Sequence, residues 1–118
     1  MKYMLLVYLN EQEWDKLSQA EKEKMMEHGN SFANELKEKN QFLAGAPLEP
    51  VAAARTIRKR ANGLLVTDGP FAETREQLGG YALIEAKDLA EAIEIGKRFH
   101  GGGLGAIEVR PVLEGGCG

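Results

Sequence analysis

The sequence predicts a single α+β domain in which two helices lie on one face of an antiparallel sheet. Three observations support this prediction: a continuous apolar segment near the amino terminus, two capped segments with helical periodicity, and an Asn-Gly pair between two short strand-like segments. The chain has 118 residues, of which 43% are hydrophobic, enough for one core but not for two. We therefore treat residues 1–113 as one domain and residues 114–118 as a flexible tail.

The first strand and the first helix have the clearest signals. Residues 3–9 are continuously apolar, a pattern typical of a short central strand that is buried on both faces. Residues 11–40 are rich in Glu, Lys, Gln and Met, and within them Ser18 and Glu21 form a capping box, which predicts a long helix. We expect one side of this helix to pack on the sheet. That side consists of Met25, Gly29, Phe32 and Leu36, flanked by Met26 and Ala33.

The middle of the chain predicts a hairpin. Residues 42–46 are a short apolar piece, and the prolines that follow predict a loop up to Ala53. The pair Asn62-Gly63 lies between residues 54–61 and residues 64–67. Both residues of this pair accept positive φ, so we expect a tight turn between two antiparallel strands.

The carboxyl-terminal part predicts a strand, a helix and a final strand. Residues 80–86 read as the strand, and residues 88–91 cap a helix that ends at Gly101. Residues 106–113 alternate polar and apolar side chains and contain a proline, which suits a strand whose amide row is partly unpaired. The helix side expected to face the sheet consists of Leu89, Ala92, Ile93, Gly96 and Phe99. The order of elements is that of a ferredoxin-like sandwich, with both helices on one sheet face and the other face directed outward.

Composition and charge restrict the location and the partners of the protein. The longest apolar run, Met4 to Leu9, is too short to cross a bilayer, so we expect no membrane partner. A single cysteine, Cys117, fits a reducing compartment, and we expect a cytoplasmic protein. The net charge of −3 and the pI near 5.5 predict no nucleic-acid partner. The basic cluster at residues 55–60 is interpreted as the solvated side of the hairpin.

The most distinctive stretch is residues 67–81, which read Thr-Asp-Gly-Pro-Phe-Ala-Glu-Thr-Arg-Glu-Gln-Leu-Gly-Gly-Tyr. Together with residues 107–112, it resembles the signature of YCII-related proteins, in the branch named for the Asp-Gly-Pro-Phe (DGPF) motif. The resemblance covers residues 1–113. It implies a ferredoxin-like subunit that forms a homodimer by packing sheets into an α/β barrel, with a cleft beside the motif. It implies no settled substrate.

The motif contains the candidate substrate-binding residues Gly69, Pro70, Phe71 and Arg75. Asp68, Gly69 and Pro70 follow a strand, and their sequence predicts a turn. Asp68 either organises this turn or belongs to a site. Phe71 either packs in the core under the turn or forms the apolar wall of a pocket. Arg75 either forms an exposed pair with the following glutamate or lines a cleft and orients an anionic substrate. The family more often has Lys at this position.

His28 is the candidate for acid/base chemistry. It lies about 60° from the centre of the apolar stripe on its helix, at the border between the buried and the solvated side. In the wider YCII-related group, the proposed acid/base dyad is a histidine on the first helix paired with an aspartate. The resemblance to that group therefore implies His28 and Asp68 as the catalytic residues. A carboxylate partner would fix the imidazole tautomer. The alternative is a helix-surface histidine without chemistry, and His100, at the end of the second helix, is interpreted as structural.

Other features argue against a cofactor. Residues 101–105 are rich in glycine, but they follow a helix end, where the dipole repels anions, so they read as a loop and not as a phosphate site. The two histidines and Cys117 lack the spacing of a zinc site. An oxygen site from Asp68, Glu73 and Glu76 is the one alternative to our expectation of no metal. Cys117 lies in the tail, so we expect no catalytic thiolate.

These observations favour a small, enzyme-like homodimer that binds a small organic acid or a ring compound. We expect His28 and Asp68 to carry out cofactor-independent proton abstraction, with elimination or isomerisation. One branch of the wider family resembles a dehydrochlorinase of chlorinated hydroquinones. The alternative is a non-catalytic binding or regulatory module, because relatives of this kind are sometimes encoded beside alternative sigma factors or fused to them. The sequence alone leaves this choice open.

Overall fold

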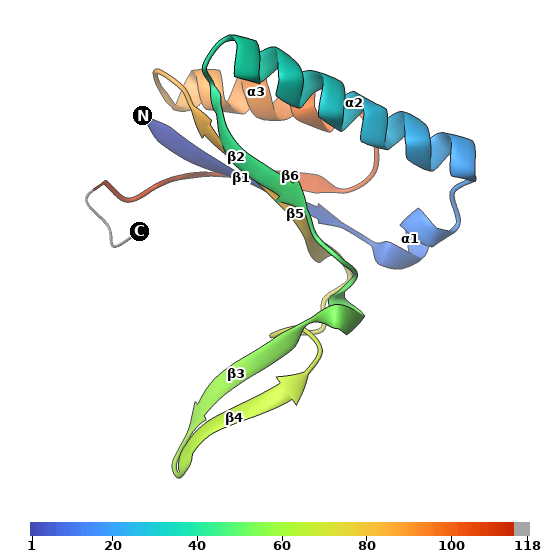
Figure 1. Cartoon of the computed structure of the whole chain (residues 1–118), viewed down its shortest axis with the longest axis vertical. Helices are drawn as coiled ribbons and strands as arrows, with labels where there is room; N and C mark the ends of the chain where they lie inside the picture. The colour runs from blue at the N-terminus through green and yellow to red at the C-terminus, as the bar shows by residue number, and fades with distance from the viewer. Residues whose placement is uncertain (115–118) are drawn as a thin grey trace.

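The computed structural model describes residues 1–114 and has two parts, a sheet covered by helices and a two-stranded arm that projects from it (Figure 1). The strands of the sheet lie in the order β2-β5-β1-β6, and neighbouring strands are antiparallel. Their bounds are Lys2–Leu9 for β1, Phe42–Pro47 for β2, Gln77–Glu85 for β5 and Ala106–Pro111 for β6. The tail expected at residues 114–118, with Cys117, lies outside the described residues except for Glu114.

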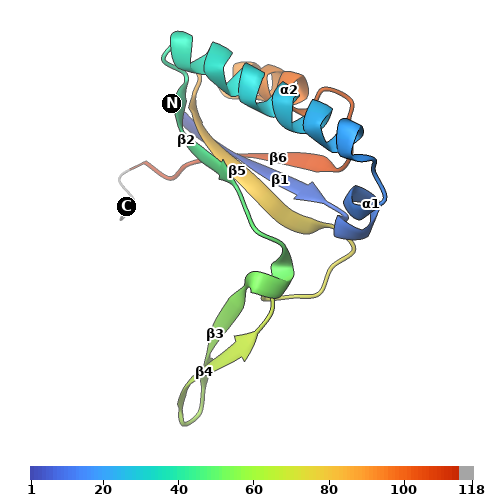
Figure 2. The ribbon, with the colours of Figure 1, turned by 45° about the vertical axis from the view of Figure 1, so that its right-hand side comes forward.

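Two long helices, α2 (Gln19–Glu38) and α3 (Leu89–His100), cover one face of the sheet, as a second view shows (Figure 2). This arrangement confirms the ferredoxin-like α+β fold. The predicted helix signals are also confirmed. Ser18 and Glu21 form the capping box of α2, Asp88 caps α3, and Gly101 ends α3 with a left-handed φ of 64°. No helix within residues 1–114 is both long enough and apolar enough to cross a membrane.

The hydrophobic core lies between these helices and the sheet. Tyr3 and Leu5 on β1 are 2% and 0% exposed, and Ile84, which pairs with Tyr3 from β5, is also fully buried. Phe32 and Leu36 of α2 cover them, as the stripe on this helix predicted. β1 pairs with a strand on each side, which confirms its predicted central position. The expected burial of both its faces is not found within the subunit, where only Tyr3 and Leu5, on the side that faces the helices, are buried.

The helical segments differ from the prediction in two details. The prediction did not include α1 (Glu11–Asp15), a separate short helix that Asn10 caps before the capping box starts α2. On α3, Ile95 is buried, while Leu89 and Ile93 are 47% and 39% exposed. The buried side is rotated because α3 packs on α2 as well as on the sheet, with Phe99 against the core.

The strand predictions also need two corrections. Residues 42–47 form a true edge strand, β2, because an edge position tolerates the proline at its end. After it comes a single 3-10 turn, η1 (Val51–Ala53), within the expected loop. In the hairpin turn only Gly63 uses a positive φ, of 121°, and Asn62 does not.

The second face of the sheet, which we name the open face, carries no helix from residues 1–114 (Figure 2). Because side chains alternate along a strand, the residues between the buried ones on β1 and β5 point to this face. Most of them are apolar. They include Met4, Leu6 and Tyr8 on β1 and Leu78, Tyr81 and Leu83 on β5. The outward-directed face that the sequence predicted is therefore present, and it is largely hydrophobic.

A matched pair of substitutions in α2 tests the position of the core. Leu36 is 1% exposed, and Met26 on the same helix is 56% exposed. We expect Leu36→Ala to lower the free energy of unfolding by about 2–5 kcal/mol, because the change removes buried surface and leaves a cavity. Met26→Ala should change it by about 0.5 kcal/mol or less. Urea denaturation measures both, and equal losses would contradict this position of the core.

Candidate functional site

The motif residues lie at the base of the arm, which consists of β3 (Arg55–Arg60) and β4 (Gly63–Asp68). These strands pair with each other and not with the main sheet (Figure 1). The predicted hairpin is thus confirmed, but as a separate ribbon inserted between β2 and β5. We name residues 68–71, which begin at the last residue of β4, the motif loop.

Hydrogen bonds from the start of the arm hold the motif loop. The backbone N–H of Gly69 donates to the carbonyl oxygen of Ala54 over 2.8 Å, and the Thr56 hydroxyl donates to the carbonyl oxygen of Gly69 over 2.9 Å. Gly69 has a φ of 93°, a value that favours glycine. The predicted turn is therefore present, and its conformation depends on Gly69.

Phe71 is displayed by this loop and not buried under it. The residue is 71% exposed, so the alternative of core packing under the turn is wrong. The guanidinium of Arg58 lies 4.6 Å from the centre of the Phe71 ring and also donates to the Phe71 carbonyl oxygen over 2.6 Å. A cation held over an exposed ring provides a surface on which a planar anionic group can stack and pair.

Asp68 has a different partner from the one expected for a turn residue. Its carboxylate lies 3.1 Å from the guanidinium nitrogen of Arg55 across the hairpin, and its side chain is 90% exposed. The backbone bonds of the turn involve Gly69 instead, so Asp68 acts as the arm's exposed counter-charge. Arg75 lies in the segment that returns from the arm to the sheet and is exposed.

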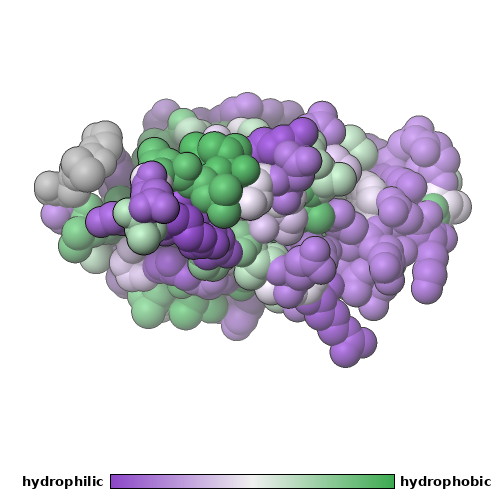
Figure 3. Space-filling model, turned by 90° about the horizontal axis from the view of Figure 1, so that it is seen from below, coloured by the Kyte–Doolittle hydropathy of each residue, from purple (hydrophilic) through white to green (hydrophobic). Residues whose placement is uncertain are grey.

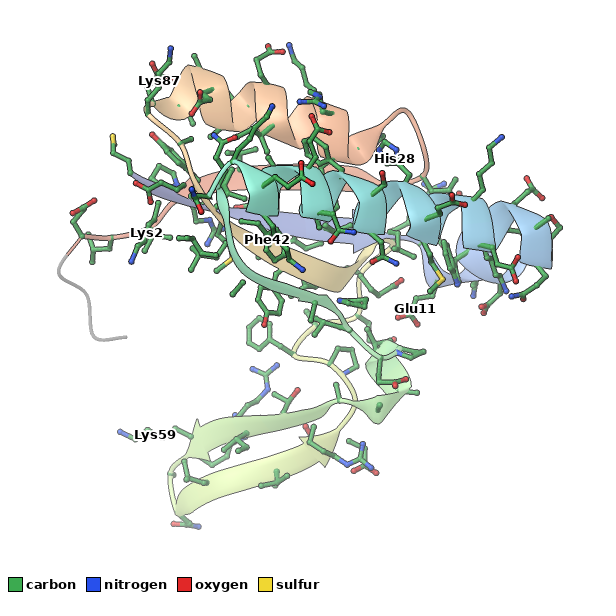
Figure 4. All side chains as sticks on the ribbon, turned by 45° about the horizontal axis from the view of Figure 1, so that its top comes forward. Lys2, Glu11, His28, Phe42, Lys59 and Lys87 are labelled. Carbon is green, nitrogen blue, oxygen red and sulfur yellow. The ribbon has the colours of Figure 1, made fainter. Side chains whose placement is uncertain are left out.

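His28 lies on the helix layer, and the arm lies on the other side of the sheet (Figure 4). The Nε2 atom of His28 is 2.9 Å from the carbonyl oxygen of Arg98 on α3. Gly101 leaves room for this ring, because a Cβ atom at that position would lie 2.5 Å from the same nitrogen. Within one subunit the structure therefore gives His28 and Asp68 different partners and does not bring them together.

Arg98 also ties α2 to α3 beside His28. Its guanidinium donates to the Glu35 carboxylate over 2.6 Å and lies 4.7 Å from the centre of the Phe32 ring. The hydrogen bond from Arg98, assisted by the charges of Arg98 and Lys39, lowers the pKa of the Glu35 carboxyl below its ordinary value of 4.5. His28, Phe32 and Glu35 share the side of α2 that meets α3, which gives His28 a structural role in this contact.

His100 stabilises the glycine-rich loop after α3. Its Nδ1 atom accepts from the N–H of Gly102 over 3.1 Å, and its Nε2 atom lies 2.8 Å from the carbonyl oxygen of Gly105. These bonds agree with the structural interpretation of His100. Within residues 1–114, no group of three or more His, Cys, Asp or Glu side chains is arranged to hold a metal ion.

Sequence reasoning missed a polar group on the open face. The Tyr8 hydroxyl donates to the Glu108 carboxylate over 3.3 Å, and the Nε atom of Arg110 donates to the second carboxylate oxygen over 2.6 Å. Glu108 pairs with Leu6, so this group adjoins the apolar part of the face. The signal was available, because residues two apart on a strand point to the same side.

Glu11 is a second residue that sequence reasoning missed, and it anchors the arm to the sheet. Its carboxylate accepts from the N–H of Val51 over 3.0 Å, and its own N–H donates to the side-chain oxygen of Gln77 over 3.1 Å (Figure 4). Both ends of the arm's connection to the sheet are thus held by one residue. No sequence pattern marks this role, because the three residues are far apart in the chain.

Sheet, helices and motif loop together define a ferredoxin-like α+β protein with an arm inserted between β2 and β5. The chain belongs to the YCII-related domain family, whose family model matches residues 1–115. It is 35% identical over 114 residues to an uncharacterized protein of Rhizobium meliloti (strain 1021). That match covers 95% of this chain and 92% of the relative.

The fold is similar to that of a solved structure. That structure is 5-chloro-2-hydroxyhydroquinone dehydrochlorinase (TftG) from Burkholderia phenoliruptrix AC1100, in complex with 2,5-dihydroxybenzoquinone. The similarity covers 98% of this chain and 96% of the other, with a TM-score of 0.55 and 16% sequence identity. At this identity the similarity establishes the shared fold alone.

The lowered pKa of Glu35 predicts a pH-dependent contribution to stability. A carboxyl whose pKa is lower in the folded state stabilises that state above the unfolded pKa, and this contribution is lost as the pH falls through the folded pKa. We therefore expect Glu35→Gln to lower the free energy of unfolding at pH 7, with the difference from wild type disappearing well below pH 4.5. Urea denaturation of the variant and the wild type, at pH 7 and at a pH well below 4.5, measures this difference. Glu38→Gln, on the same helix, is the control, and a Glu35 effect that persists in acid would contradict the assignment.

Proposed function

We propose that the protein is a cytoplasmic homodimer of the DGPF branch that binds a small organic acid or ring compound at the motif loop. The observation that carries this proposal is the pair of Arg58 and Phe71, an exposed ring under a cation on a loop fixed by hydrogen bonds. An anionic ring compound could stack on Phe71 and pair with Arg58. Gly69 and Pro70 present the pair, and Arg75 is a further cation on the same segment.

The open face supports the proposed homodimer. An apolar sheet face on a chain of 118 residues is a large hydrophobic surface to leave in water. Two such faces packed together about a twofold axis would give the α/β barrel that the family resemblance implies. Tyr8 and Glu108 would then lie at the junction, as polar groups that can orient a ligand in an otherwise apolar cleft.

The chemistry that we propose is cofactor-independent proton abstraction with elimination or isomerisation. The fold shared with TftG, a dehydrochlorinase, is compatible with a role in small-molecule chemistry. His28 and Asp68 are the proposed acid/base pair. Because each has another partner within the subunit, the pair requires the dimer to bring His28 of one copy to Asp68 of the other.

One observation favours a non-catalytic alternative. His28 contacts a backbone carbonyl in the α2–α3 contact, where it needs no chemical role. Under this alternative the protein is a binding or regulatory module, with association to an alternative sigma factor as one form of it. Failure of the acid/base test below, together with ligand binding at the motif loop, would favour this alternative.

Ligand titration tests the binding site. We expect 2,5-dihydroxybenzoquinone or benzoate, used as probes of planar anionic rings, to shift the amide NMR signals of Gly69 and Phe71. Phe71→Leu should weaken binding roughly 2- to 10-fold, because an aromatic contact adds about 0.5–1.5 kcal/mol beyond its burial. Trp14→Leu is the matched control, since Trp14 also lies under a cation, Lys22, whose Nζ atom is 6.0 Å from the ring centre. An equal effect of both variants, or probe binding that leaves the motif loop unshifted, would contradict the proposal.

The imidazole NMR signals of His28 test the acid/base pair. If His28 and Asp68 meet in the dimer, Asp68→Asn should move these signals, because a neighbouring carboxylate fixes the tautomer and the charge of the ring. Asp15→Asn, which alters an exposed carboxylate on α1, should leave them in place. Unchanged His28 signals in Asp68→Asn would remove the pair from the proposal.

A further inference from the structure

The arm exposes a hydrophobic side that no other segment among residues 1–114 covers. Ile57 and Val66 are paired across the hairpin, and Leu64 lies beside them on the same side. They are 65%, 61% and 75% exposed. We name these three residues the arm face. Figure 3, which views the molecule from the arm's end, shows hydrophobic side chains gathered next to strongly hydrophilic ones. A two-stranded ribbon without a core is at best marginally stable in water, so the arm face calls for a covering partner.

The arm is held firmly at its base, although its far end is free of the subunit. Glu11 binds the start of η1, Gly69 bonds to Ala54, and Arg55 pairs with Asp68. Leu48 adds a backbone bond to Gly79 of β5. These contacts fix the direction in which the arm leaves the sheet. The arm face is therefore presented in a defined position and not on a loose loop.

Charge separates the arm from the rest of the chain. The arm, residues 55–68, contains four basic residues, at positions 55, 58, 59 and 60, and one acidic residue, Asp68, so it carries a net charge of +3. Since the net charge of the chain is −3, the remainder carries −6. Two arms would repel each other, whereas an arm and the acidic body of another copy attract each other.

We infer that the arm of one copy docks on the body of a second copy and buries the arm face there. The apolar side chains provide the contact, and the charge difference selects the body of the partner over the partner's arm. The motif loop at the base of the arm then lies at the junction of the two subunits, so each ligand site is completed by the other copy. This inference rests on the proposed homodimer and adds to it the element that links the subunits.

Charge reversal tests the selection of the partner's body. Lys59→Glu with Arg60→Glu should raise the dimer dissociation constant about tenfold or more, and the effect should shrink at high salt. Lys24→Glu with Lys87→Glu changes the net charge by the same amount, but it makes the body more acidic and should leave the constant unchanged or lower it. Sedimentation equilibrium measures both. Equal weakening by the two variants would overturn the inference, because it would reflect net charge alone.

A second pair of substitutions, measured in the same way, removes the apolar contact. Ile57→Thr with Val66→Thr keeps two β-branched strand residues and removes hydrophobic surface. We expect the dissociation constant to rise about tenfold or more, because the substitutions remove apolar surface that the contact between the copies would bury. An unchanged constant would show that the arm face stays in water and would overturn the inference.

A spin label at the tip of the arm locates the contact directly. A nitroxide on Asn62→Cys, in a Cys117→Ser background, is mixed with isotope-labelled chain without nitroxide, so that only contacts between copies broaden the NMR signals. We expect broadened signals from the body of the isotope-labelled chain. If only the arm of the isotope-labelled chain is broadened, or if no signal is broadened in a sample with dimer mass, the inference is overturned and the proposed dimer stands. A sample with monomer mass would overturn both.

Discussion

The whole structure depends on a sheet that is covered on one side only. The helices α2 and α3 pack on one face and bury Leu5 and Ile84 completely, and the part of the chain that the structure describes places no helix on the second face. That open face is still largely apolar, because Leu6 and Tyr81 alternate with the buried residues on the same central strands. A one-sided core is typical of a subunit whose second face is meant for another protein surface.

The arm connects the sheet to the candidate site, and like the sheet it has an apolar side that is exposed in the subunit. It is inserted between β2 and β5, and Glu11 fixes its connection to the sheet. The arm has its own exposed apolar side and presents Phe71 under Arg58 at its base. The proposed ligand site and the proposed subunit contact therefore share one element. The helix layer has a separate organisation, since His28 and Glu35 both meet Arg98 there.

The elements with strong local signals could be predicted from the sequence. The apolar run of β1, the capping box at Ser18 and the Asn-Gly turn depend on neighbouring residues only, and all three elements are present. The features that sequence reasoning missed depend on contacts between distant segments. The exposure of Phe71 and the rotation of the buried side of α3 are of this kind, because each follows from which element packs nearby. The turn at Gly69 was predicted, but its anchoring to Ala54 and Thr56 was not.

The central claim is that a second copy of the chain covers the open face. The mass of the protein in solution, measured by light scattering at micromolar concentration, tests it most directly. The account predicts twice the chain mass of 12.9 kDa over this range. A mass of 12.9 kDa would contradict it, because the open face would then be stable in water without a partner.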